Sequence, residues 1–369
     1  MAVLSLRTAA FRNLADADTE TGAKNVFLVG ENGQGKTNFL EAVYFCSYGS
    51  SFRGVKDSEL VRLEERAFSA AARTGSFEDS SFLNRQISVK YEDSKKTISL
   101  DGKKIEDRRD LLEASPCVVF CHEDMEFVSG TQERRRWFFD QTQSLYDLVY
   151  LDDLRRYRRI LRTRNAVLKE AKLNFDRSPR TMEVLDALDP QLAQYGFNLM
   201  EKREAAARRF SVLFGPLYEE VSGLGDIGVV YGPSWKCGGP DEAAELLFKR
   251  READMAGGLT LSGPHRDRYG FVRRGGEFAA RASTGQRRLL ALLLRAAQAR
   301  CFSDMTGKTP VLLLDDVLLE LDGEKRRRFL KTMPVYEQAF FTFLPEEPYQ
   351  GYRDADTLTY TVKEGVIGP

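Results

Sequence analysis

The sequence lacks the apolar runs, of roughly eighteen residues or more, that a membrane-spanning helix requires. Its N-terminal stretch, MAVLSLRTAAFRNLADADTE, has no long apolar core and turns acidic early, which is not the pattern of a secretory signal peptide. The five cysteines are odd in number and scattered, which argues against a disulfide framework. These absences predict a protein of the reducing cytoplasm.

The chain also lacks net charge, because 55 Lys and Arg residues balance 55 Asp and Glu residues. Net charge therefore gives no sign of a polyanionic partner, and a nucleic-acid surface would need basic residues concentrated locally. No internal repeat or low-complexity tract is present. With 369 residues, of which 42% are hydrophobic, the chain can form one large domain or two smaller ones.

Hydrophobic patterning predicts strands near both ends of the chain and helices between them. Strands are expected at residues 3–11, 24–29, 85–106 (as a meander), 116–121, 310–314, 338–343 and 357–367 (as a hairpin). Helices are expected directly after the loop at 30–35 and at 133–173, 182–214 and 284–302, with irregular chain or a strand with turns at 221–240. The pattern predicts an α/β unit built from residues 1–125 and 250–369, with a mostly helical insertion at 126–249.

The segment GENGQGKT has the phosphate-loop spacing Gly30-x4-Gly35-Lys36-Thr37. Glycines let backbone N–H groups turn towards phosphates, Lys36 would reach the β- and γ-phosphates, and Thr37 would ligate Mg²⁺. A glycine turn that merely caps a helix is the alternative. The apolar strand expected in front of the loop favours the nucleotide interpretation.

A second motif, VLLLDDV, joins a buried apolar strand to two acids. In phosphate-loop ATPases such a strand holds the carboxylate on the Mg²⁺ side, which would be Asp315. Asp316 would then orient or deprotonate the attacking water. The alternative is a buried strand that ends in two solvated aspartates.

A third motif, Ser283-Thr284-Gly285-Gln286, begins a long amphipathic helix. The unpaired N–H groups and the positive dipole end of a helix suit a phosphate. A Ser N-cap on an ordinary helix is the alternative. The position of the turn before the acidic strand matches the signature helix of ABC-type ATPases.

The order of these motifs, followed by Glu320-Leu321-Asp322, resembles the ABC ATPase head of the SMC and Rad50 kind. Longer strings resemble the RecF family of bacterial recombination and repair proteins almost from end to end. They are FRN (11–13), GENGQGKTNFLEAVYF, SSFRG, VVFCHEDMEFVSGTQERRRWFFD, LSGPHRDRY, STGQRRLLALLLRAAQ and LLLDDVLLELD.

The resemblance implies an ABC-type head with a second helical lobe, ATP and Mg²⁺ as cofactors, and an ATP-dependent homodimer. In such dimers the signature of one subunit closes on the nucleotide of the other, so Ser283 would act together with Lys36 and Asp316 in catalysis, and Asp322 would lie at the interface. Metal ligands would be Thr37 and Asp315, and Thr342 would occupy the switch position. The implied nucleotide-binding residues are Arg12, Asn13, Gly30, Asn32, Gly33, Gly35, Lys36, Thr37, Asn38, Ser283, Gly285, Gln286 and Asp322.

The sequence departs from the family pattern at a few positions. His122 stands where Pro is common, Arg268 where an acid is common, and Phe343 within a stretch that is usually three threonines. Asp316 is one methylene shorter than the Glu of transporter ATPases, from which we expect slow hydrolysis.

The segment LRRYRRILRTR (154–164) is rich in arginine and has no acid, and three consecutive arginines at 134–136 form a second cluster. The candidate DNA contacts are Arg134, Arg135, Arg155, Arg156, Arg159 and Arg162. Arginines on a solvated helix face, or paired with acids, are the alternative. The resemblance implies duplex DNA at single-strand gaps, a nucleoid-associated location, and RecR and RecO as partners in recombinational repair, replication-fork maintenance and the SOS response. It also implies a weak, DNA-stimulated ATPase that aids recombinase loading.

Two other protein classes are weighed against this function. A transporter ATPase subunit is disfavoured, because transporter heads place the lysine and signature much closer together and no membrane segment adjoins. A DNA scaffold that binds ATP but scarcely hydrolyses it would use the same ATP-binding residues.

One cysteine cluster and one histidine are further candidates for a site. Cys117-x3-Cys121-His122 has no second ligand pair and sits on an apolar strand, so buried core cysteines are favoured over a zinc site. His265, in a Gly-Pro loop, is open to a structural or a nucleotide-sensing role.

Overall fold

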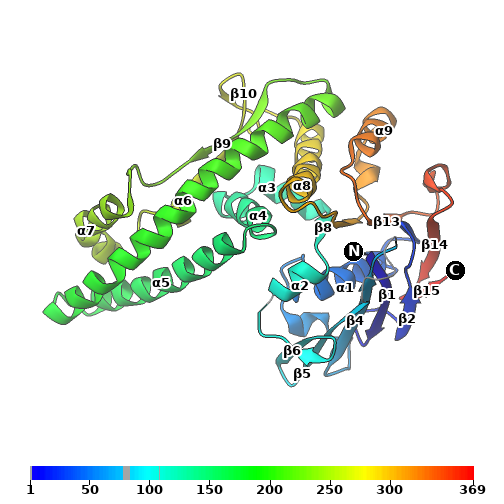
Figure 1. Ribbon diagram of the computed structural model, residues 1–369, viewed down its shortest axis with the longest axis horizontal. Coiled ribbons are helices and arrows are strands. Elements are labelled where there is room, and N and C mark those ends of the chain that lie inside the picture. Colours follow the sequence, from blue (N-terminus) through cyan, green and yellow to red (C-terminus); the bar gives the residue numbers. More distant parts are fainter. Residues whose placement is uncertain (1, 78–83, 108) are drawn as a thin grey trace. The chain divides into compact units, whose positions relative to one another are not determined.

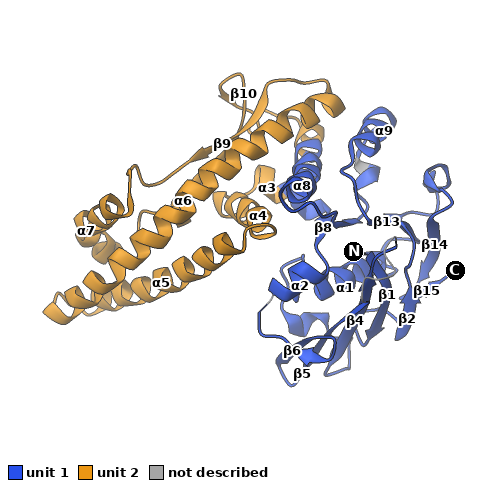
Figure 2. Ribbon diagram, in the orientation of Figure 1, with its two compact units in different colours: residues 1–125, 288–369 blue, residues 126–287 orange. Residues whose placement is uncertain are grey.

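The computed structural model describes residues 2–77, 84–107 and 109–369. It contains two compact units, one formed by residues 1–125 with 288–369 and the other by residues 126–287 (Figure 2). The first unit is therefore assembled from both ends of the chain. Among the described residues, none of the helices is long and apolar enough to cross a membrane.

The first unit contains two six-stranded sheets. One has the order β2-β1-β4-β5-β6-β7 and its strands pair antiparallel. Its strands are β1 (Ala2–Ala9), β2 (Ala17–Glu20), β4 (Phe68–Gly75), β5 (Arg85–Glu92), β6 (Lys95–Leu100) and β7 (Lys103–Lys104). The expected meander at 85–106 is present, and Asp101 and Gly102, both with positive φ, form one of its turns.

The other sheet has the order β15-β14-β3-β13-β12-β8, and all its neighbours pair parallel except β14 and β15. Its strands are β3 (Asn25–Val29), β8 (Cys117–Phe120), β12 (Val311–Leu314), β13 (Gln338–Phe343), β14 (Thr357–Lys363) and β15 (Val366–Gly368). Every residue of β3, β8, β12 and β13 is buried. Burial on both faces explains why these strands read as continuous apolar runs.

Helix α1 (Lys36–Tyr48) packs against β1, β4 and β5 of the antiparallel sheet and against β8 and β13 of the parallel sheet. Its side chains are therefore buried nearly all round, including Phe39, Leu40 and Phe45. The rest of this unit contains α2 (Arg109–Ala114), most of α8 (Thr284–Thr306), α9 (Gly323–Thr332) and the short 3-10 helices η1 (Asp57–Leu60), η2 (His122–Asp124), η4 (Val317–Glu320) and η5 (Tyr349–Tyr352).

The parallel sheet positions the candidate nucleotide residues. β3, β13, β12 and β8 are neighbours in that order, so their carboxyl ends meet at one edge of the sheet. The phosphate loop follows β3, Thr342 lies in β13, and Asp315 follows β12. Ligands of open α/β sheets bind at this edge.

The second unit is built on long helices. Figure 1 shows α5 beside α6, and the two helices are in extensive contact. Its elements are α3 (Met125–Ser129), α4 (Gln132–Ser144), α5 (Leu148–Leu173), α6 (Pro179–Ser222), α7 (Pro240–Gly257), η3 (Pro264–Arg266) and a sheet of β9 (Ile227–Gly232), β10 (Arg268–Arg273) and β11 (Gly276–Glu277).

Three features of this unit differ from the sequence-based expectation. The helix expected at 133–173 is two helices, because Asp147 accepts from the Tyr150 N–H group and caps the start of α5. Helix α7 was not expected, since its sequence lies between Gly- and Pro-rich stretches. The unit ends at residue 287 rather than 249, because β10 pairs with β9 along its length.

Buried ion pairs join the elements of the second unit. Arg203 of α6 donates to Asp140 of α4 and, at 2.8 Å, to Asp267, and all three side chains are buried. Its Nη1 also donates to the Pro264 carbonyl at 2.7 Å. In a second cluster, Arg164 of α5 pairs with Asp189 at 2.8 Å and with Asp254 at 2.7 Å. Charged groups rather than apolar contacts alone therefore hold these helices together.

Candidate functional site

The phosphate loop connects β3 to α1 with two glycines in conformations that other residues rarely adopt. Gly33 has φ 78° and Gly35 has φ 118°. A Cβ at Gly30 would lie 2.3 Å from the Val362 carbonyl oxygen, so no larger residue fits there. The Lys36 ammonium lies inside the loop and donates to the carbonyls of Gly30 at 2.7 Å and Glu31 at 3.2 Å.

The acids after β12 and the threonine of β13 form a connected set beside this loop. Thr37 Oγ1 donates to Asp315 Oδ1 at 2.8 Å. Thr342 Oγ1 accepts from the Asp316 N–H group at 2.7 Å and lies 2.6 Å from Asp316 Oδ1 and 3.3 Å from Asp315 Oδ1. The single Thr342 hydroxyl therefore contacts both aspartates, a role that follows from its register position between β3 and β12.

Asp315 lies beside the phosphate loop, in contact with Thr37. Burial raises its pKa to about 7, the charge of Asp316 adds to this, and the hydrogen bond from Thr37 opposes it. A hydroxyl and a carboxylate oxygen in contact are hard ligands of the kind Mg²⁺ prefers. The described residues contain no group of three or more His, Cys, Asp or Glu side chains able to hold a metal ion. Thr37 and Asp315 therefore fit Mg²⁺, an ion that commonly keeps waters and phosphate oxygens beside a few protein ligands.

Asn13 contacts the phosphate loop, and Arg12 contacts the helix α1 that follows it. Asn13 Nδ2 donates to the Gly33 carbonyl at 3.3 Å, and its Oδ1 accepts from Asn38 at 2.7 Å. Arg12 donates to the fully buried Glu41 carboxylate at 3.0 and 3.3 Å. Both residues therefore contact the loop or the first helix directly.

Arg53 was missed by sequence reasoning. Its Nη1 donates to Asn38 at 3.2 Å and lies 3.8 Å from the Glu41 carboxylate. The resemblance of SSFRG to the family was a signal, but the sequence does not show that this segment folds back beside α1.

The hairpin turn between β14 and β15 donates hydrogen bonds to the phosphate loop. Sequence reasoning also missed this contact. The Gly365 N–H group donates to the Gln34 carbonyl at 2.8 Å, and the Glu364 N–H group donates to Gln34 Oε1 at 2.6 Å. Gly365 also accepts from the Ala15 N–H group at 2.9 Å. The hairpin of β14 and β15 therefore helps to fix the conformation of the phosphate loop.

Replacing Gly365 with Ala should weaken ATP binding about tenfold or more. Its φ is 81°, and a Cβ would lie 1.8 Å from the Asn13 carbonyl oxygen, so the turn must move away from Gln34. Backbone strain of about 1–3 kcal/mol corresponds to this loss of affinity. Titration with a fluorescent ATP analogue measures it, with Gly368→Ala as control because no atom lies within 4 Å of a Cβ there. Equal affinity of both variants would show that the hairpin does not shape the loop.

The signature turn lies in the second unit. The Ser283 N–H group donates to Gln286 Oε1 at 2.8 Å, and the Gln286 N–H group donates to Ser283 Oγ at 3.3 Å. Ser283, Thr284 and Gly285 are exposed. In the first unit, Asp322 caps α9 by accepting from the Lys325 N–H group at 2.9 Å.

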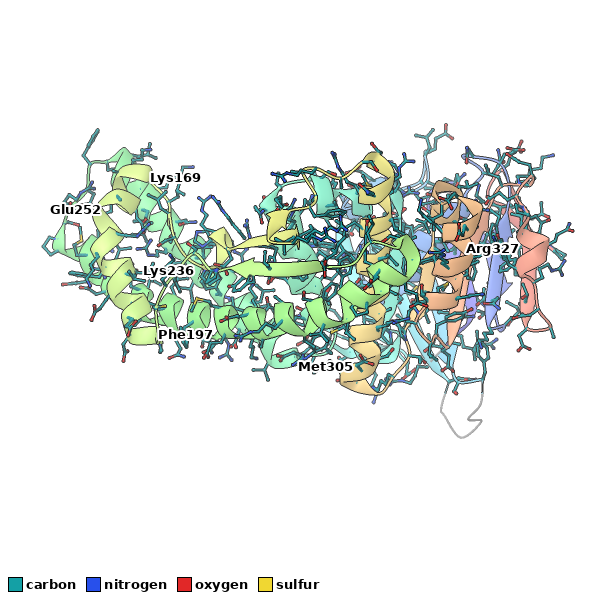
Figure 3. All side chains as sticks on the ribbon, turned by 90° about the horizontal axis from the view of Figure 1, so that it is seen from above. Lys169, Phe197, Lys236, Glu252, Met305 and Arg327 are labelled. Carbon is teal, nitrogen blue, oxygen red and sulfur yellow. The ribbon has the colours of Figure 1, made fainter. Side chains whose placement is uncertain are left out.

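The arginines proposed to contact DNA fall into two groups. Arg135 has a side chain that is 11% exposed, and it donates to the carbonyls of Tyr269 and Val128 at 3.0 and 2.7 Å. Arg134 is exposed and pairs with Glu126 at 2.7 Å. The exposed arginines of α5 are Arg155, Arg156, Arg158, Arg159 and Arg162. Figure 3 draws the side chains on the ribbon, and Lys169 of the same helix is labelled there.

The cysteines considered for a zinc site and His265 are enclosed by other protein groups. Cys117 and Cys121 are buried, and burial raises the pKa of Cys117 to about 12. His265 Nδ1 lies 2.7 Å from the Tyr157 hydroxyl and its Nε2 lies 2.9 Å from the Thr260 carbonyl. Burial lowers the pKa of His265 to about 4, so the ring is neutral at pH 7.

Of the departures from the family pattern, Phe343 contacts the phosphate loop, because its carbonyl accepts from the Gly30 N–H group at 3.1 Å. His122 and Arg268 are exposed, whereas Phe343 is buried among aromatic rings. Asp124, in the same motif as His122, pairs with the buried Arg295 of α8 at 2.7 Å.

Comparisons with known proteins agree with this geometry. A family model described as RecF/RecN/SMC N terminal domain matches residues 2–362. The DNA replication and repair protein RecF of Treponema pallidum (strain Nichols) is 42% identical over 358 residues, which cover 96% of this chain and 97% of the relative. The RecF protein of Bacillus subtilis (strain 168) is 30% identical and covers 93% of each chain.

Comparison with solved structures indicates the same family. The recombination mediator protein RecF-ATP in the RecFOR pathway superposes with a TM-score of 0.87 at 28% identity, covering 99% of this chain and 98% of the other. The Smc head domain from Pyrococcus furiosus, with a TM-score of 0.54 at 16% identity and a coverage of 99% and 95%, shares the fold. This chain, with the α/β fold of an ABC-type ATPase head and a long helical insertion, therefore belongs to the RecF family of DNA replication and repair proteins.

Proposed function

We propose that this protein is an ATP-driven DNA clamp of recombinational repair and replication-fork maintenance. The observation that carries the proposal is the contact of Thr37 with Asp315 and of Thr342 with both Asp315 and Asp316, beside the phosphate loop. This arrangement suits a nucleoside triphosphate with a divalent cation.

Each residue at this edge has a role in the proposed site. The phosphate loop, with Asn32, holds the phosphates, and Lys36 neutralises their charge. Thr37 and Asp315 hold Mg²⁺, which would offset the negative charge of the phosphates. Asp316 takes the position of the base for the attacking water. Arg12, Asn13, Asn38 and Arg53 position the loop through the contacts described above.

The exposed signature turn supports an ATP-dependent homodimer. Ser283, Gly285 and Gln286 begin a long helix, where N–H groups and the helix dipole favour a phosphate. Because this turn is exposed, we propose that it contacts the γ-phosphate held by a second copy. Asp322, at the start of α9, would lie at the same interface.

The exposed arginines of α5 are the proposed DNA surface, with Arg155, Arg156, Arg159 and Arg162 at its centre and Arg134 beside it. Such contacts would be salt-dependent and independent of base sequence. We leave out Arg135 because backbone carbonyls engage its guanidinium. Duplex DNA at single-strand gaps is the proposed ligand, in keeping with the RecFOR pathway named for the solved relatives.

RecO and RecR are the proposed partners, and the proposed outcome is recombinase loading at the nucleoid. We infer a weak ATPase that DNA stimulates and whose hydrolysis releases the DNA. The short Asp316 side chain, tied to Thr342, is the basis for expecting slow turnover.

The test is the affinity for a labelled gapped duplex, measured by fluorescence anisotropy at fixed salt with no nucleotide, with ADP and with ATP. Wild type should bind at least about tenfold more tightly with ATP, a difference of about 1.4 kcal/mol. Lys36→Ala and Ser283→Arg should lose this gain, because one lacks the phosphate contact and the other blocks the signature turn. Arg208→Ala, which removes an exposed pair with Glu204, should keep it. Equal binding under all nucleotide conditions would refute an ATP-dependent clamp.

A further inference from the structure

A cavity of about 310 Å³ lies in the second unit beside the signature turn. Its lining includes the arginines 273, 274 and 281, and Glu277 is the one acid among the lining residues. The volume would hold about ten water molecules of ~30 Å³ each, which is ample for a phosphate group with some of its hydration. Three arginines and one acid among the lining residues of such a hollow favour an anion.

The hairpin of β10 and β11 holds two of these arginines at the cavity. Arg274 and Gly275, with φ 49° and 78°, form its two-residue turn. Arg273 donates to the Gly225 carbonyl at 3.0 Å, a neutral acceptor that leaves its charge uncompensated. Arg274 pairs with Asp226 at 3.3 Å, and both side chains are largely exposed.

Arg281 is the arginine of the cavity whose positive charge can bind an added anion. Its side chain is exposed, and Nη1 would lie 3.9 Å from a Cβ at Gly276, which places the guanidinium against the hairpin. Within the part of the chain that the structure describes, this guanidinium has no hydrogen bond or ion pair. A planar guanidinium whose N–H groups have no protein acceptor can bind a phosphate through two of them.

Gln286 connects the cavity to the signature turn. It lines the cavity, and its Oε1 accepts from the Ser283 N–H group at 2.8 Å. A phosphate that contacts Ser283 would therefore lie at the edge of the cavity, within the neighbourhood of Arg281. Arg281 also precedes Ser283 by only two residues in the chain.

We propose that this cavity binds the terminal phosphate of the ATP held by a second copy of this chain, with Arg281 supplying the contact. The inference rests on the proposed ATP-dependent dimer and extends it by a specificity residue. ADP lacks the phosphate that Arg281 would contact, so the cavity would make dimerisation selective for ATP. A phosphate of the DNA backbone is the other source of the same chemistry, and the test separates the two.

The first measurement is the dimer dissociation constant by mass photometry, without DNA, in ATP with Mg²⁺ and in ADP with Mg²⁺. Arg281→Ala should raise the constant in ATP at least tenfold, and Arg281→Lys should fall between it and wild type because Lys lacks the two-pronged contact. The affinity of the dilute monomer for a fluorescent ATP analogue should not change. Arg208→Ala is the matched control from the same unit.

The second measurement mixes Arg281→Ala with Lys36→Ala. A heterodimer contains one site with both Lys36 and Arg281 when the arginine acts across the interface. The mixture should therefore dimerise with ATP more tightly than either variant does alone. A general loss of structure would not be rescued in this way.

Three outcomes would overturn the assignment of Arg281. They are an unchanged dimer constant for Arg281→Ala, no rescue in the mixture, and a loss confined to DNA affinity, which would assign the cavity to a DNA phosphate. A wild-type protein that does not dimerise with ATP would instead refute the proposed function, and the role of Arg281 with it.

Discussion

Asp316→Asn is expected to lower ATP turnover by about 10²–10⁴-fold, the contribution of a positioned general base. Asn keeps the shape of Asp and tolerates the left-handed conformation of this position, where φ is 52°. It can also keep a hydrogen bond with Thr342 Oγ1, which contacts Asp316 at 2.6 Å. The variant should therefore fold and bind ATP, and lose only the group that activates water.

The same variant should keep its ATP-dependent affinity for gapped DNA and release the DNA more slowly. Turnover is measured as phosphate release with and without DNA, and DNA release by competition after complex formation in ATP. Turnover equal to that of wild type would remove Asp316 from the role of base. Loss of ATP affinity would instead make it a ligand of the nucleotide or its cation. Fast DNA release without turnover would favour a scaffold over a hydrolysis-driven clamp.

Arg203→Met is expected to lower the free energy of unfolding of the second unit by about 3–5 kcal/mol. The substitution keeps much of the volume of the side chain but leaves the buried Asp140 and Asp267 carboxylates without the guanidinium between them. It also removes the donor to the Pro264 carbonyl, so the loop at 260–267 should loosen. Urea unfolding followed by circular dichroism and by tryptophan fluorescence measures the change, since Trp235 is buried in this unit.

Two further variants test this explanation. Arg208→Ala, which removes an exposed i,i+4 pair on the same helix, should change the free energy of unfolding by less than about 0.5 kcal/mol. Adding Asp140→Asn and Asp267→Asn to Arg203→Met should recover part of the loss, because the uncompensated charges are then gone. A small effect of Arg203→Met alone would mean that water reaches these carboxylates.

Much of the nucleotide site was predictable because its signals are local. The glycine spacing before Lys36, the acids after a continuous apolar run, and the small residues before a long helix each lie within a few residues. The strands β3, β8, β12 and β13 were predictable for the same reason, since burial on both faces favours a mostly apolar run, which only Asn25, Gln338 and Thr342 interrupt. Sequence patterns could not show the start of α5 at Asp147, because no Gly or Pro marks that break.

The sequence by itself determined the class of protein and the residues proposed to contact phosphate and cation, because a motif encodes the local backbone that such a site needs. Only the tertiary structure decided which distant segments complete it. The Gly365 turn meets Gln34, and Thr342 reaches both aspartates, through strand neighbours that no local pattern specifies. It also decided that Arg135 and Arg164 are largely or fully covered, whereas Arg155, Arg156, Arg158, Arg159 and Arg162 of α5 are exposed. Exposure depends on which helix face packs against its neighbours.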